Sequence, residues 1–365
     1  MLVYYLPGHW ERAAEVAAWA RSALNVFTEA FGPCPCEELK IAEVRGWFAG
    51  MEYPCFIMIS SADVMEGDEK TAEMVVAHEV AHQWWYYLVG SDPWEDPWMD
   101  EALATYSELL YFWLSYGEEK YREALRRFVA EPYMSYLEGH GEALPSGLSA
   151  GEYPDEESYF MSVYNRGAWA FHMLGEAVGR ERLVSAFRDY AKEYGGREAG
   201  PSDLREVLKE SLGEVVDRLF DQWIYGWGVP EPYASDVTVG EGVIEVEVRG
   251  LGGFEIPLRV TVETTCGNFT SLEWVREGDA VRIRVKEGCE PALVVLDPLD
   301  DVPGPQGGPV TVKSEGEGCS AVTGSVSLLA ATVLGILIWK KWCGRRDLNP
   351  GLERSAPRGL GRLPS

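Results

Sequence analysis

The chain has 365 residues, 46% of them hydrophobic, and its formal net charge at pH 7 is −27. A chain of this length and apolar content can form more than one core, which predicts at least two domains. The surplus of negative charge would repel a phosphate backbone and argues against a nucleic-acid partner. The acidic bias fits either a halophilic source or an ordinary soluble surface, and composition does not choose between them.

The first predicted elements are a helix and a group of short strands. Residues 9–31 are Ala-rich with amphipathic spacing, which predicts a helix, and Pro33 and Pro35 punctuate the chain after it. Residues 39–60 contain the short apolar runs of strands. We expect the run 54–60, Pro-Cys-Phe-Ile-Met-Ile-Ser, to be an edge strand that can pair with an extended peptide.

The next segment has two histidines four residues apart, His78 and His82, with Glu79 directly after the first. Residues at this spacing lie on one face of a helix, as two imidazoles that share a metal ion must. Glu101 follows after eighteen residues, near the start of a second apolar-periodic run. A Pro-rich connection lets that second helix fold back over the first. Three protein ligands with a fourth position left for water are the arrangement of a catalytic zinc site.

Three stretches of this sequence resemble the aminopeptidase N (membrane alanyl aminopeptidase) family of gluzincin zinc metallopeptidases. They are HEVAHQWW at 78–85 with DEALATY at 100–106, Gly50-Met51-Glu52-Tyr53, which is similar to the GxMEN exopeptidase signature, and YFMSVYNRGA at 159–168. The resemblance covers residues 1–230 and, more loosely, the strand-rich stretch after them. It implies an α+β chain with a thermolysin-like, mainly helical catalytic domain over 1–230. It also implies a zinc-dependent aminopeptidase acting on peptides with a free N-terminus.

The resemblance implies a role for each matching residue. His78, His82 and Glu101 would hold one Zn²⁺ ion, while Glu79 takes the proton from the attacking zinc-bound water and returns it to the departing amine. Tyr164 would donate a hydrogen bond to the oxyanion that develops on the substrate. Helical periodicity alone favours a different interpretation of Tyr164, as a core residue.

Substrate binding is expected at Gly50, Met51 and Glu52. The Glu52 carboxylate can pair with the free α-amino group of a peptide, so that only the first peptide bond meets the metal. Tyr53 stands where the family signature has Asn, which keeps a zinc endopeptidase open as an alternative. A non-catalytic binding scaffold with the gluzincin fold is a second alternative, although folding alone requires neither Glu79 nor Tyr164. Cobalt or manganese could occupy such a ligand set in vitro.

Helical patterns continue to about residue 228, and strand patterns follow. Glu108 lies two turns after Glu101 on the same helical face, where it is either a partner of a ligand histidine or a solvated residue. Over 231–303, Val and Ile alternate with charged residues between regularly spaced turns, which predicts a small β-sandwich.

The cysteines and one sequon fit an exterior location only weakly. Cys266 and Cys289 could bridge strands of the sandwich. The other cysteines before the strand-rich stretch, Cys34, Cys36 and Cys55, allow no pairing to be predicted. Asn268-Phe269-Thr270 is a glycosylation sequon.

The C-terminal part predicts a membrane anchor. After a Gly/Pro-rich acidic linker at 304–320, residues 321–339 form an uncharged, mostly apolar run long enough to cross a bilayer. Lys and Arg residues follow at once, so the positive-inside rule predicts a single-pass protein with an extracytoplasmic catalytic domain. A buried core helix is the alternative. We expect residues 340–365 to be a basic, disordered tail. The chain opens shortly before Gly50 without the N-terminal β-domain of the family or a signal peptide, which predicts a late gene start or a fragment.

Overall fold

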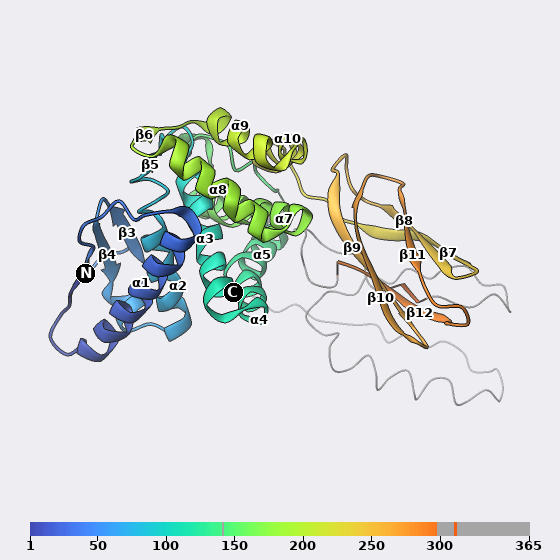
Figure 1. Ribbon diagram of the computed structural model, residues 1–365, viewed down its shortest axis with the longest axis horizontal. Helices are drawn as coiled ribbons and strands as arrows, with labels where there is room; N and C mark the ends of the chain where they lie inside the picture. Colours follow the sequence, from blue (N-terminus) through green and yellow to red (C-terminus); the bar gives the residue numbers. More distant parts are fainter. Residues whose placement is uncertain (141, 298–309, 312–365) are drawn as a thin grey trace, which may run out of the picture. The chain divides into compact units, whose positions relative to one another are not determined.

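The computed structural model describes residues 1–140, 142–297 and 310–311. Helices and short strands occupy the chain up to Ile224, and strands follow from Tyr233 (Figure 1). The run at 321–339, for which a transmembrane helix is expected, lies outside these residues, as do the linker before it and the tail after it. Within the part of the chain that the structure describes, no helix is both long and apolar enough to span a bilayer.

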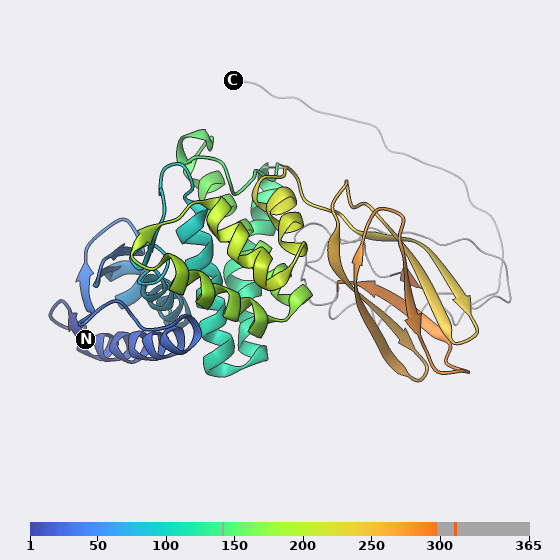
Figure 2. The same cartoon turned by 45° about the horizontal axis from the view of Figure 1, so that its top comes forward.

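The N-terminal part is a four-stranded mixed sheet packed against two helices. Its strands are β1 (Leu2–Tyr4), β2 (Lys40–Val44), β3 (Gly50–Tyr53) and β4 (Phe56–Ser60), in the spatial order β1-β2-β4-β3. Helix α1 (Trp10–Phe31) contacts β1, and helix α2 (Glu69–Ala81) contacts β3, β4 and α1. Both views show α1 beside this sheet (Figures 1 and 2).

The edge strand beside α2 is β3, which corrects the expectation for residues 54–60. Strand β4 pairs in parallel with β2 on one side and antiparallel with β3 on the other. Its backbone groups are therefore engaged on both sides, and Ile57 and Ile59 are buried. A continuous apolar run is typical of such an interior strand. The outer strands of this sheet are β1 and β3, and β3 is the one beside α2 whose edge could pair with an extended peptide.

The long helix α3 (Trp98–Tyr116) is the centre of the helical part. It contacts α2, α4, η4 and α7, and nearly all of its residues from Trp98 to Phe112 are buried. The remaining elements of this part are η1 (Ser61–Met65), β5 (Val89–Gly90), α4 (Glu118–Ala124), η2 (Leu125–Ala130), α5 (Glu131–His140), η3 (Ala150–Glu152), α6 (Glu156–Phe160), η4 (Met161–Arg166), α7 (Gly167–Val178), α8 (Arg180–Tyr194), β6 (Arg197–Glu198), α9 (Pro201–Leu212), α10 (Val215–Leu219) and η5 (Phe220–Ile224).

Two antiparallel sheets follow. They are formed by β7 (Tyr233–Gly240), β8 (Val243–Arg249), β9 (Ile256–Thr264), β10 (Gly267–Val275), β11 (Ala280–Arg284), β12 (Pro291–Leu296) and β13 (Val310–Thr311), in the orders β10-β9-β12-β13 and β11-β8-β7. Alternate residues of β8, such as Ile244 and Val246, are buried, as the alternating pattern predicts. The disulfide between Cys266 and Cys289 is present, which confirms that pairing.

Candidate functional site

His78 and His82 lie at the C-terminal end of α2. The helix begins at an N-cap, Asp68, whose side chain accepts a hydrogen bond from the Thr71 backbone N–H. One turn of helix separates the two histidines, so their rings face the same side, and their Nε2 atoms lie 3.1 Å apart.

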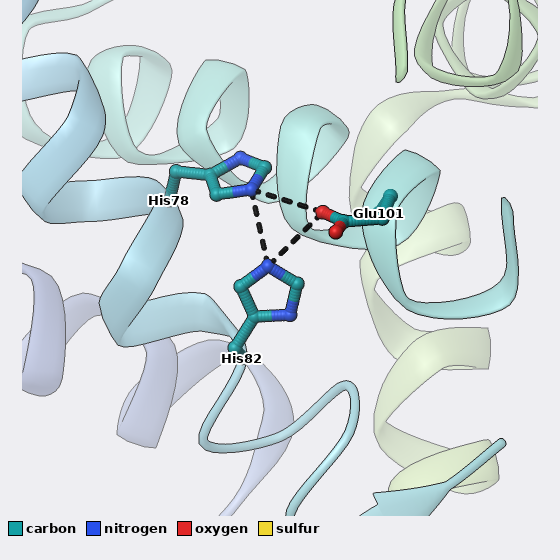
Figure 3. Close-up of side chains that lie close together, drawn as sticks. All are labelled: His78, His82 and Glu101. Atoms are coloured by element: carbon teal, nitrogen blue, oxygen red, sulfur yellow. Dashed lines mark hydrogen bonds and ion pairs between the residues drawn. The ribbon is translucent and has the colours of Figure 1, made fainter. Parts of the chain in front are cut away.

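Glu101 reaches the same point from the first turn of α3. Its Oε2 lies 3.3 Å from Nε2 of His78 and 3.2 Å from Nε2 of His82 (Figure 3). Within the described residues, these three side chains are the one group of His, Cys, Asp or Glu whose ligand atoms converge closely enough to hold a metal ion. The spacing in the sequence and the contact between α2 and α3 therefore bring the three expected ligands together.

The outer nitrogen of each histidine ring is also engaged. Nδ1 of His78 lies 3.1 Å from Oε2 of Glu108, and Nδ1 of His82 lies 3.0 Å from the Trp85 carbonyl oxygen. Glu108 is 2% exposed, so the interpretation of it as a solvated residue is wrong. Partners of this kind orient an imidazole and leave its other nitrogen available to a metal.

The three ligand side chains influence one another's pKa values. Burial opposes a charge on His82, but the adjoining Glu101 carboxylate outweighs burial and raises the pKa of His82 to about 9. Burial likewise opposes ionisation of Glu101, yet His82 and His78 hold its pKa below the usual value. A buried carboxylate that stays ionised between two imidazoles is a ligand suited to a divalent ion.

Glu79 points into the same region with an unpartnered oxygen. Its Oε2 is buried and has no hydrogen-bond partner among the described residues. Burial raises the pKa of the Glu79 carboxyl to about 7. Since buried polar atoms normally have partners, this oxygen indicates that a water or ligand belongs beside it. The residues thus fit a metal ion with a water next to Glu79.

Gly50 is required by the size of Glu79. A Cβ placed on Gly50 would lie 2.1 Å from Glu79 Oε1, far inside any real contact. The first position of the GMEY segment therefore lies directly against the carboxylate expected to act as the base.

The three residues expected to bind substrate do not all lie on the same face of strand β3. Gly50 and Glu52 lie opposite the buried Ile59 and Ile57 of β4, on the face of the sheet toward the core. Met51 alternates with them and faces the other way, so only its backbone could contact a substrate at this site. Glu52 is close enough to influence the pKa values of Glu79 and His82. No Lys or Arg among the described residues pairs with it.

Tyr164 lies on η4 and also borders the ligand cluster. Its ring stacks near that of His78, with 5.9 Å between ring centroids, and its hydroxyl lies near Glu101. The Phe160 ring also stacks on it, with 4.3 Å between ring centroids. Burial, and after it the Glu101 charge, raises the pKa of Tyr164 well above its usual value, so the phenol is neutral. The side chain is thus a hydrogen-bond donor beside the site.

Sequence reasoning missed the contacts that fix the β3–β4 turn. A disulfide joins Cys36 to Cys55, which leaves Cys34 as the free cysteine of the described residues. Gln83 Oε1 accepts a hydrogen bond from the Cys55 N–H at 2.8 Å, and Gln83 Nε2 donates one to the Tyr53 carbonyl at 3.4 Å. The one available signal was the position of Gln83, directly after a ligand histidine.

Asp100 was also missed. It is buried beside Glu101, whose backbone N–H donates to Asp100 Oδ1 at 2.9 Å. Burial, and after it the charge of Glu101, raises the pKa of Asp100 to about 8.

Comparison with known proteins adds independent evidence. Residues 38–223, just over half of the chain, match the peptidase family M1 domain. The chain is 28% identical over 229 residues to "Aminopeptidase M1-D" of Oryza sativa subsp. japonica, covering 57% of this chain and 25% of that protein. It is 25% identical over 239 residues to "Probable aminopeptidase 1" of Sulfurisphaera tokodaii, covering 61% and 30%. The chain thus spans less than a third of the length of these relatives.

Among solved structures, the chain is similar to Legionella pneumophila aminopeptidase A in complex with aspartic acid. The TM-score is 0.68, and the similarity covers 84% of this chain and 36% of that one. At 16% identity this likeness supports the fold alone. The matched residues 38–223 include β3, the three candidate ligands, Glu79 and Tyr164. The resemblance noted in the sequence is confirmed, and the chain belongs to peptidase family M1.

Proposed function

We propose that this protein is a zinc-dependent aminopeptidase, which hydrolyses the N-terminal peptide bond of peptides with a free N-terminus. The main observation in support is the convergence of His78, His82 and Glu101 next to the unpartnered carboxylate oxygen of Glu79. Zinc is the metal expected for a family M1 peptidase.

The ligand atoms present fit zinc. Two imidazole nitrogens and one carboxylate oxygen are the donors of many catalytic zinc sites. Ligands about 2.0–2.1 Å from a tetrahedral ion lie roughly 3.3 Å from one another. The three separations here run from 3.1 to 3.3 Å. When bound, zinc would polarise the scissile carbonyl group and acidify the attacking water.

The side chains around the ligands supply the rest of the chemistry. Glu79 accepts the proton of the attacking water and delivers it to the nitrogen of the departing amine. The Tyr164 hydroxyl donates a hydrogen bond to the carbonyl oxygen as negative charge develops there. The buried position of Glu79 and the location of Tyr164 beside His78 support these two roles.

Glu52 and the edge of β3 would select the substrate. The Glu52 carboxylate pairs with the α-ammonium group, so the first peptide bond is held at the metal. The backbone edge of β3 can pair with the extended peptide without reading its side chains. Both features favour an exopeptidase.

Hydrolysis of paired fluorogenic amides tests this proposal. Free and N-acetylated aminoacyl amides are given to the purified chain with zinc added, with Glu79→Gln and Glu52→Gln in parallel. We expect cleavage of the free-amine substrates alone, none with Glu79→Gln, and a KM about 10- to 100-fold higher with Glu52→Gln, because a charge-assisted hydrogen bond is lost. Equal cleavage of acetylated substrates would indicate an endopeptidase. Zinc binding without cleavage of either substrate would favour the binding scaffold.

We also propose that the protein is a single-pass membrane protein whose catalytic residues lie outside the cytoplasm. The apolar run at 321–339 and the basic residues directly after it support this proposal. The two disulfides support an oxidising compartment. Extraction of membranes at alkaline pH and protease treatment of intact cells test it. Release of the protein by alkali, or protection of its catalytic part from added protease, would contradict the assignment.

A further inference from the structure

Arg166 is a fully buried cation two residues after Tyr164, at the end of η4. Burying a guanidinium is costly unless its donors are satisfied. Its hydrogen-bond partners therefore indicate what the side chain holds together.

All five N–H donors of Arg166 are used, and none of their acceptors is a carboxylate. Nε donates to the Trp223 carbonyl at 3.0 Å, Nη1 to the Gly228 carbonyl at 2.7 Å and the Tyr133 hydroxyl at 3.3 Å, and Nη2 to the carbonyls of Gly226 at 2.8 Å and Gln222 at 3.4 Å. Four of these acceptors are backbone carbonyls at the end of η5 and in the segment after it. Carbonyls at a helix C-terminus lack helical partners and carry partial negative charge, which suits a cation.

The residues on either side of Arg166 fasten η4 to two further elements. The Asn165 side-chain amide donates to the backbone carbonyls of Phe128 and Val129 in η2, at 3.0 and 3.1 Å. A Cβ on Gly167 would lie 2.5 Å from Cβ of Ala102, the residue after Glu101, so α7 begins in close contact with α3. Three consecutive residues thus fix the turn that carries Tyr164 from three sides.

This arrangement matters because of where Tyr164 must place its hydroxyl. A hydrogen-bond donor to a developing oxyanion has to be held in position beforehand. The turn is also a π-helix, a wider form of helix that is frequent at functional sites. The Tyr164 ring stacks on Phe160, which directly precedes η4, and it also lies near the rings of Tyr159 and His78. The direction of the Tyr164 side chain therefore depends on the backbone of η4.

We propose that Arg166 is a positioning residue, which acts through Tyr164 by locking η4 onto the segment 222–228. The proposal rests on the proposed function in one respect, that Tyr164 assists hydrolysis. A merely structural role for Arg166 would lower stability without a selective effect on Tyr164, and this difference can be measured.

Arg166→Lys is the informative variant, because an ammonium keeps the charge but has three donors and cannot reach all four carbonyls. Arg180→Lys is the matched control. Arg180 is a second buried arginine, and its hydrogen bonds go to the carboxylates of Glu118 and Glu176. Both variants are made in the full chain, together with Tyr164→Phe and the double variant Arg166→Lys/Tyr164→Phe, and thermal stability and zinc content are recorded for each.

With a free-amine aminoacyl amide, Arg166→Lys should lower kcat about 10- to 100-fold with KM changed less than about threefold, because a displacement near 1 Å has this cost. Tyr164→Phe should lower kcat about 100- to 1,000-fold, as does loss of an oxyanion donor. The double variant should be as slow as Tyr164→Phe alone. The proposal would be overturned if the decrease in kcat of the double variant equalled the product of the two single decreases. It would also be overturned if Arg166→Lys lowered kcat no more than Arg180→Lys does.

A second readout does not depend on activity. 3-Fluorotyrosine is incorporated at position 164, and its ¹⁹F resonance is recorded in the zinc-free protein. Arg166→Lys should shift or broaden this resonance, whereas Arg180→Lys should leave it in place. An unchanged resonance in Arg166→Lys overturns the proposal. If the wild-type protein cuts no peptide, the proposed function fails while this measurement still decides the role of Arg166.

Tyr133→Phe covers the case in which Arg166→Lys does not fold. It removes one of the five acceptors and leaves the four carbonyls in place. The ¹⁹F resonance of residue 164 should shift in the same direction as in Arg166→Lys, but by a smaller amount. A Tyr133→Phe protein with wild-type kcat and an unmoved resonance would count against the proposal.

Discussion

Gly50 illustrates how a small residue can be specified by a neighbour across the fold. Its Cα lies where the Glu79 carboxylate leaves no room for a Cβ. Gly50→Ala should therefore displace Glu79 and lower kcat by about 100-fold, the cost of moving a catalytic group by about 1 Å. Steady-state kinetics with zinc determination check this. Gly139→Ala is the control, because a Cβ there meets nothing within 4 Å. Equal activity of the two variants would show that Glu79 tolerates the added methyl group.

Glu108 tests the importance of a ligand's outer hydrogen bond. Glu108→Gln keeps the size of the side chain but removes the charge that faces His78 Nδ1. We expect zinc affinity to fall by about 10- to 100-fold. Competition with a chelator of known affinity measures the change.

Glu73→Gln provides the comparison for that variant. Glu73 is on α2, the helix that carries His78, and it accepts hydrogen bonds from the hydroxyls of Tyr111 and Tyr116 of α3. Its zinc affinity should match the wild type. A Glu108→Gln protein that binds zinc as tightly as Glu73→Gln would remove Glu108 from the metal site.

The spacing of residues in the sequence predicted the ligand side chains of this site. It could not predict the contacts made by backbone groups. His78, His82 and Glu101 follow from helical periodicity and one reversal of the chain. Glu108 stayed ambiguous because a carboxylate on an amphipathic helix can face either solvent or a histidine. The Trp85 carbonyl that engages His82 has no sequence signature, because every residue has a carbonyl group.

At the scale of elements, the turn of the β3–β4 hairpin is held by a disulfide to Cys36, which lies between α1 and β2, and by Gln83, which follows α2. Cys36→Ser/Cys55→Ser should lower the free energy of unfolding by about 3 kcal/mol, because the cross-link closes a loop of this length. The sequence separation is 19 residues. Denaturant unfolding measures the loss.

Unfolding both proteins in the presence of a reductant checks whether the difference in stability comes from the disulfide. The reductant should destabilise the wild type but have a smaller effect on the Cys36→Ser/Cys55→Ser variant, which keeps one of the two bridges of the described residues, Cys266–Cys289. Identical losses in the two proteins would mean that the Cys36–Cys55 bridge contributes little.

The sequence pattern predicted where helices and strands occur better than it predicted the order of the strands in the sheet. The helix expected at 9–31 spans Trp10–Phe31, because its apolar spacing is regular and two prolines follow. The edge of the sheet was misassigned because strand order depends on which strands pair across the chain. Strand β4, at 56–60, pairs with β2 on one edge and β3 on the other, which the apolar pattern alone did not reveal. For the same reason, the pairing of Cys36 with Cys55 could not be predicted before the hairpin was known.

For the whole molecule, the net charge of −27 is the dominant electrostatic feature. Like charges on a folded chain repel, and dissolved salt screens them. The unfolding temperature should therefore rise as sodium chloride increases from about 0.02 to 0.5 M, a range over which the Debye length falls severalfold. Potassium chloride at equal ionic strength should produce the same rise. A falling midpoint would show that attractive ion pairs outweigh the repulsion, and a requirement for molar salt would favour a halophilic source.

The contacts that fix the β3–β4 turn also determine which side chain of β3 faces the metal cluster. Side chains alternate along a strand, so a slip of one residue in the pairing of β3 with β4 would turn Met51 toward Glu79 and move Glu52 to the opposite face. Such a slip would remove the acidic group from the metal cluster while leaving all three ligands in place. By fixing the turn at both Cys55 and Tyr53, the Cys36–Cys55 disulfide and the Gln83 amide keep β3 in the alignment that places Glu52 on the same face as Gly50, toward Glu79.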